Sequence, residues 1–152
     1  MLGISGSLRV KSLNLAALKY AGSVLPSETM SLEIANFADI PIYNGDIEDK
    51  GIPESVLRLH AQIMEADAIL IGSPEYNFSL SGALKNAIDW VSRVKGNPWE
   101  NKPVAIIGCT AGPSGGIRGI YELKKILEAF NAKILNKECN IPDNYLKFDK
   151  DL

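Results

Sequence analysis

The chain has 152 residues, of which 46% are hydrophobic and 22% are charged, and its formal net charge is -2. This length and composition predict one compact globular domain over residues 1–152. No basic block suggests a nucleic-acid partner, and no apolar run approaches the roughly 20 residues that span a bilayer. We therefore expect neither a nucleic-acid-binding protein nor a membrane protein.

The few cysteine and histidine residues argue against metal chemistry. Cys109 and Cys139 have neither disulfide nor metal-type spacing, so we expect two buried free thiols. His60 is the only histidine, which excludes a multi-histidine site, and we predict no bound metal. The chain enters a short strand at Met1 with no signal peptide, so a cytoplasmic location is expected.

Apolar runs alternate with segments of helical period, a pattern that predicts βαβ units and a parallel sheet. Strands are expected at residues 1–5, 31–35, 66–72, 104–109 and 132–136, and helices at 12–24, 53–65, 81–94 and 116–130. A loop is expected around Pro41, Asn44 and Gly45. Five strands and four helices fit a flavodoxin-like α/β fold, a doubly wound parallel five-stranded sheet of order 2-1-3-4-5.

The C-terminal residues 143–152 are charged and poorly periodic. A fifth helix normally packs beside the first helix of this fold, so the predicted sheet lacks its last helix. Either the chain is trimmed, or one sheet face is partly bare or covered by a partner, because exposed apolar area costs roughly 25 cal/mol per Å².

The first loop suits a phosphate. Residues 3–9 read Gly-Ile-Ser-Gly-Ser-Leu-Arg, and Ser12 and Asn14 follow at a helix start. Hydroxyls, free backbone N–H groups, the helix dipole and the Arg9 guanidinium all favour an anion there. The spacing matches neither a P-loop, a dinucleotide fingerprint nor a nucleophile elbow.

Two further loops follow buried strands. Residues 74–77 read Pro-Glu-Tyr-Asn, and an aromatic ring with an amide can stack on and hydrogen-bond to a flat polar ring. Residues 110–116 again offer glycines and hydroxyls. All three loops follow strands whose carboxyl ends meet at one edge of the predicted sheet, where such folds bind ligands. Together they suggest a site for flavin mononucleotide (FMN).

These residues also carry a family resemblance. Residues 6–14, Gly-Ser-Leu-Arg-Val-Lys-Ser-Leu-Asn, resemble the first motif of the NADPH-dependent FMN reductase family, which includes chromate and quinone reductases and azoreductase-like enzymes. Residues 74–77 with 84–90 resemble its second signature, and residues 115–118 resemble its glycine-rich third loop. The resemblance extends from residue 1 to about residue 137.

The resemblance implies a tightly held FMN and assigns its contacts by loop. The phosphate would be bound by residues of the first motif: Ser7, Arg9, Ser12 and Asn14. The flavin ring and ribityl chain would be contacted by residues of the second signature: Pro74, Glu75, Tyr76 and Asn77. The third loop would border the ring with Thr110, Gly112 and Ser114.

The implied activity is that of an FMN-dependent NAD(P)H oxidoreductase. NADPH or NADH would pass a hydride to FMN, which would reduce a quinone, flavin, azo or metal-oxyanion acceptor by a ping-pong mechanism. No side chain is assigned a catalytic role. A flavodoxin-type electron carrier and a non-catalytic flavodoxin-like binding domain are the alternatives, and a serine hydrolase is a more distant one.

The helix expected at 81–94 carries two apolar stripes, although one stripe is enough to cover a sheet. The second stripe contains Trp90, which is either an interface anchor or a residue buried under a neighbouring loop. Arg118 and Tyr121 lie away from the core stripe of the helix at 116–130. We expect a homodimer, with a homotetramer as the alternative.

Overall fold

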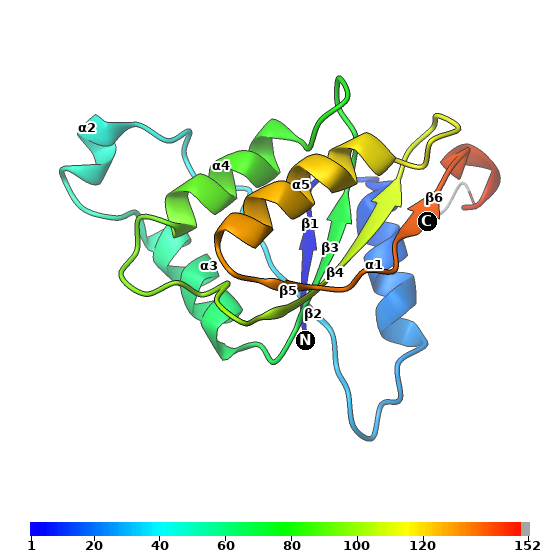
Figure 1. Cartoon of the computed structure of the whole chain (residues 1–152), viewed down its shortest axis with the longest axis horizontal. Helices are drawn as coiled ribbons and strands as arrows, with labels where there is room; N and C mark the ends of the chain where they lie inside the picture. The colour runs from blue at the N-terminus through cyan, green and yellow to red at the C-terminus, as the bar shows by residue number, and fades with distance from the viewer. Residues whose placement is uncertain (150–152) are drawn as a thin grey trace.

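The computed structural model describes residues 1–149, and within them a parallel sheet forms the centre of the molecule (Figure 1). Its order is β2-β1-β3-β4-β5, with β6 beside β4, and every strand pair is parallel. The predicted order is confirmed. The strands are β1 (Leu2–Ser5), β2 (Glu33–Ile34), β3 (Ile69–Ser73), β4 (Pro103–Cys109), β5 (Lys133–Ile134) and β6 (Cys139–Ile141).

The expected fifth strand is divided into two pieces. β5 pairs with the beginning of β4 and β6 pairs with its end. Between them, Leu135 is half exposed and still donates its N–H to the carbonyl of Val104, and Glu138 forms an ion pair with Lys124 on a helix that covers the sheet. The local apolar pattern did not predict this interruption.

The helices are α1 (Leu13–Ser23), α2 (Gly45–Glu48), α3 (Glu54–Glu65), α4 (Gly82–Val91) and α5 (Ile117–Ala129), with a 3-10 turn η1 (Asn144–Leu146). Ser12 and Ser81 cap α1 and α4, because their hydroxyls accept the N–H groups of Leu15 and Leu84. α2 lies where only a loop was expected, and the Asn44 side chain caps it. No helix within residues 1–149 is long and apolar enough to cross a membrane.

The helices form two layers on the sheet. Helices α3, α4 and α5 lie on one face and α1 lies on the other (Figure 1). The strand β3 faces both layers: Ile69 and Ile71 belong to the larger core, and Leu70 belongs to a smaller cluster with Leu18 of α1. Phe148, after η1, packs against this smaller cluster, so the segment that follows η1 covers part of the α1 face.

Trp90 does not anchor an interface. Its side chain is fully buried, and its Nε1 donates a hydrogen bond of 2.8 Å to the carbonyl of Pro41. The ring of Tyr43 meets it edge-on, with centroids 5.0 Å apart. The interface interpretation of Trp90 was therefore wrong, and the alternative is correct: the loop that leads to α2 covers this side of α4.

Candidate functional site

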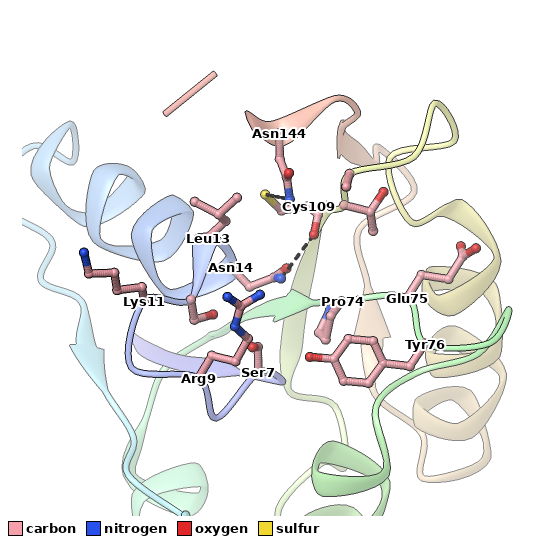
Figure 2. A pocket seen from close by; sticks show the side chains of 13 residues that line it. Ser7, Arg9, Lys11, Leu13, Asn14, Pro74, Glu75, Tyr76, Cys109 and Asn144 are labelled. Carbon is pink, nitrogen blue, oxygen red and sulfur yellow. Dashed lines mark hydrogen bonds between the residues drawn. The ribbon is translucent and has the colours of Figure 1, made fainter. Parts of the chain in front are cut away.

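A cavity of about 300 Å³ opens where the loops after β1, β3 and β4 meet (Figure 2). The predicted site residues that line it come from all three loops: Ser7, Arg9, Ser12, Asn14, Pro74, Glu75, Tyr76 and Thr110. The prediction that these loops converge at one edge of the sheet is confirmed. Lys11, Leu13, Cys109, Ala111 and Asn144 complete the lining.

The first loop is held close to the second. The N–H of Gly6 donates to the carbonyl of Gly72 at 2.8 Å, and the Ser81 hydroxyl donates to the carbonyl of Gly6. A Cβ on Gly6 would lie 2.8 Å from Cδ of Pro74, so only glycine allows this approach. These contacts fix the position of the first loop, which suits a phosphate, relative to the second loop, which suits a ring.

The first loop presents positive charge at a helix start. The Ser7 and Ser12 side chains are buried beside the cavity, while Arg9 and Lys11 are exposed at its edge. Ser12 already uses its oxygen as acceptor for α1, so its hydroxyl proton is available to a ligand. With the dipole of α1, this set of donors and cations fits a phosphate group.

Asn14 provides the observation that tests whether a ligand fits. Its Nδ2 donates to the carbonyl of Cys109 at 3.1 Å, but its buried Oδ1 has no partner among the described residues. A buried acceptor without a donor costs about 1–3 kcal/mol. Because this oxygen belongs to a cavity-lining residue, a ligand hydroxyl such as those of a ribityl chain could satisfy it. The residues present therefore fit FMN.

The second loop is a tight turn. Tyr76 and Ser79 exchange backbone hydrogen bonds of 2.9 and 3.1 Å, and Asn77 and Phe78 between them both have positive φ. Such non-glycine residues cost of order 1 kcal/mol each. The turn places the half-exposed ring of Tyr76 at the wall of the cavity, facing Arg9 and Ser7 across it in Figure 2.

Three predicted residues do not belong to the lining: Asn77, Gly112 and Ser114. Asn77 lies at the tip of the tight turn, and the carbonyl of Gly112 accepts the N–H of Asp143 and the hydroxyl of Thr110. Their contact with a ligand stays a prediction.

Asn144 is a lining residue that the sequence did not reveal. It is buried, its N–H donates to the carbonyl of Thr110 at 3.1 Å, and its Nδ2 lies 3.7 Å from Sγ of Cys109. It comes from η1, which the pairing of β6 with β4 and the bonds to Thr110 and Gly112 bring to the cavity. No motif or spacing in the sequence marks it.

The two cysteines differ. Cys109 is buried, as expected, and its burial raises the pKa of its thiol, although the Asn144 hydrogen bond opposes the shift. A protonated thiol is a poor nucleophile, so burial disfavours nucleophilic reaction at Cys109. Cys139 is exposed, so the expectation that it is buried was wrong, because β6 lies at the edge of the sheet with Cys139 beside Ile107.

Known proteins resemble this chain over most of its length. An NAD(P)H-dependent FMN reductase of Pseudomonas aeruginosa is 47% identical over 137 residues, which are 90% of this chain and 74% of that protein. A quinone reductase of Escherichia coli K12 is 40% identical over 133 residues, 87% of this chain and 71% of the relative. The solved structure of FerB, a flavoenzyme NAD(P)H:(acceptor) oxidoreductase from Paracoccus denitrificans, superposes with a TM-score of 0.85 at 34% identity, covering 99% of this chain and 80% of that one.

The profile of one family, described as NADPH-dependent FMN reductase, matches residues 1–145, which include all three cavity loops and Asn144. Together with the identities above, this match shows that the chain belongs to the NADPH-dependent FMN reductase family.

Proposed function

We propose that the domain formed by residues 1–152 is an FMN-dependent NAD(P)H oxidoreductase that reduces quinones, flavins, azo compounds or metal oxyanions. The observation that carries the proposal is the cavity itself. It joins a cationic, hydroxyl-rich helix start to an aromatic wall, with the unpaired oxygen of Asn14 between them. FMN bound there would supply hydride transfer between NAD(P)H and the acceptor.

Each side chain has a binding or orienting role in this proposal. Ser7, Arg9 and Ser12 would bind the phosphate, and Asn14 would accept a hydrogen bond from a ribityl hydroxyl. Tyr76 and Thr110 would fix the position of the ring from opposite loops. No general acid or base is required, because orientation and a preorganised polar site are what the protein contributes.

We propose that the nicotinamide donor and the acceptor use the same cavity mouth in turn, which is the order of a ping-pong mechanism. Steady-state NADPH oxidation, measured at several fixed concentrations of a soluble benzoquinone, tests this order. Parallel double-reciprocal plots are expected. Intersecting plots would contradict the shared mouth, and no NADPH oxidation at all would favour the electron carrier or the non-catalytic domain.

A homodimer in the cytoplasm is also part of the proposal, with a homotetramer as the alternative. The free thiols of Cys109 and Cys139 suit a reducing compartment. Tyr121 on α5 and Phe78 in the second loop expose more than half of their side chains, and such aromatic residues are enriched at interfaces. Sedimentation at micromolar concentration tests the assembly: a monomer would refute it.

A further inference from the structure

The N-terminus of α5 is not capped by its own residues. Its N-cap is Gly116, which has no side chain and a φ of 86°. The N–H groups of Arg118 and Gly119 donate instead to Oε2 of Glu75, at 3.0 and 3.3 Å. A carboxylate at this end of a helix also gains from the helix dipole. Glu75 thus performs from the second loop the task that an N-cap residue normally performs.

The other oxygen of Glu75 is also engaged. Oε1 accepts a hydrogen bond of 3.3 Å from the guanidinium of Arg118, and the Glu75 side chain is only 11% exposed. The same guanidinium lies 4.9 Å from the centre of the Phe78 ring. Figure 2 shows the Glu75 carboxylate directed toward α5 and away from Arg9 and Ser7. Its contacts are therefore with the helix, although the residue borders the cavity.

A second contact joins the second loop to α5. A Cβ on Gly119 would lie 3.1 Å from the carbonyl oxygen of Ser79 and 3.3 Å from that of Pro74. The two ends of the Pro74–Ser79 turn therefore rest directly on the backbone of α5. This close approach brings Glu75 within hydrogen-bonding distance of the N–H groups in the first turn of α5.

We propose that Glu75 is a positioning residue: it caps α5 from outside and so holds the Pro74–Ser79 turn, with Tyr76, in the shape that receives FMN. The positive φ angles of Asn77 and Phe78 are conformations that such residues rarely adopt alone, so the turn depends on contacts of this kind. The proposal replaces a direct contact between Glu75 and the ligand by an indirect role. Its consequence for FMN rests on the proposed function.

Amide hydrogen exchange on the FMN-free protein tests the cap without any ligand. Glu75→Ala removes both acceptor oxygens. Amide exchange at Arg118 and Gly119 should then become about tenfold faster, because loss of a capping side chain typically lowers the stability of a helix end by roughly that factor. Glu75→Gln keeps an amide oxygen that can accept the same N–H groups and should stay within about threefold of wild type. Glu122→Ala is the matched control, since Glu122 lies on α5 and pairs only with Lys125 among the described residues. Unchanged exchange in Glu75→Ala would overturn the proposal.

FMN titration and redox potentiometry then separate positioning from direct contact. Glu75→Ala should weaken FMN binding about tenfold, while Glu75→Gln binds FMN within about threefold of wild type. Glu75→Gln should also leave the flavin absorption spectrum and midpoint potential unchanged, because the lost charge points away from the ligand. A shifted spectrum or potential in Glu75→Gln would overturn the proposal in favour of direct contact. A wild-type protein that binds no FMN would refute the proposed function. Amide exchange would still show whether Glu75 caps α5.

Discussion

At the scale of single residues, positive charge distinguishes the end of the cavity that the first loop forms. Arg9 and Lys11 bring two positive charges to the start of α1, where the helix dipole adds to them. A phosphate monoester carries roughly two negative charges near neutral pH. This local complementarity supports the proposal that the first loop binds the phosphate end of FMN.

Replacing Arg9 by alanine should weaken FMN binding by about 10- to 100-fold, because hydrogen bonds to charged groups contribute about 1.5–3 kcal/mol. Flavin fluorescence titration of the FMN-free protein measures the effect. Arg58→Ala is the matched control, since Arg58 lies on α3, pairs with Asp39 and does not line the cavity. Equal dissociation constants for Arg9→Ala and wild type would show that the phosphate binds elsewhere.

The two thiols should differ in reactivity. At pH 8 a chromogenic thiol reagent should modify Cys139 rapidly, whereas Cys109 should react only after unfolding, because burial raises its thiol pKa and blocks access. Cys139→Ser should abolish the rapid phase. A rapid phase that persists in Cys139→Ser would show that Cys109 is accessible and that η1 does not cover it.

The pH dependence of stability follows from the same shift. The folded pKa of Cys109 lies above its unfolded value, so its contribution to stability is fully present below the unfolded pKa and is lost as pH rises through the folded pKa. Cys109 should therefore lower the free energy of unfolding only as the solution becomes alkaline, which denaturant unfolding at neutral and alkaline pH measures.

The sequence predicted which residues of the first loop line the cavity, for a physical reason. Ser7, Arg9 and Ser12 lie together because they follow one another in a single loop and helix start, so a local motif can show them. Asn144 and the bond from Asn14 to the carbonyl of Cys109 arise from tertiary contacts. Such contacts leave no local pattern in the sequence.

At the scale of elements, α4 shows how an amphipathic pattern can mislead. Its second apolar stripe is real, but the surface that covers it comes from the loop before α2, through the bond from Trp90 to Pro41 and the ring of Tyr43. Periodicity tells which faces are apolar and leaves open whether a partner or the same chain covers them. The segment between β5 and β6 likewise makes a contact across elements that periodicity does not show, the ion pair between Glu138 and Lys124.

Trp90→Ala should lower the free energy of unfolding by about 3–5 kcal/mol, since a fully buried indole is lost, whereas Trp90→Phe should cost less. Urea denaturation of each variant gives the values. Val10→Ala, at a 98% exposed position, should have no effect. If Trp90→Ala dissociated an oligomer without changing the unfolding of the subunit, the assignment of Trp90 to the interior would be contradicted.

At the scale of the whole molecule, the sheet brings three loops that are far apart in the sequence to one edge. The order β2-β1-β3-β4-β5 places β1 beside β3 and β3 beside β4, so the loops after these strands become neighbours. Alternating apolar runs predicted the parallel sheet, and its order followed from the flavodoxin-like fold that five strands and four helices fit. The sequence pattern could not predict how α5 contacts the second loop or how η1 completes the cavity, because those contacts depend on the angles and side chains of packed elements.

The central claim is that this cavity holds FMN and that NADPH reduces it. The most direct measurement is the visible absorption spectrum of the purified protein, first with added FMN after removal of unbound flavin, and then with NADPH in the absence of oxygen. Flavin bands should remain with the protein and bleach when NADPH is added. Bands that stay oxidised with NADPH, or no retained flavin at all, would contradict it.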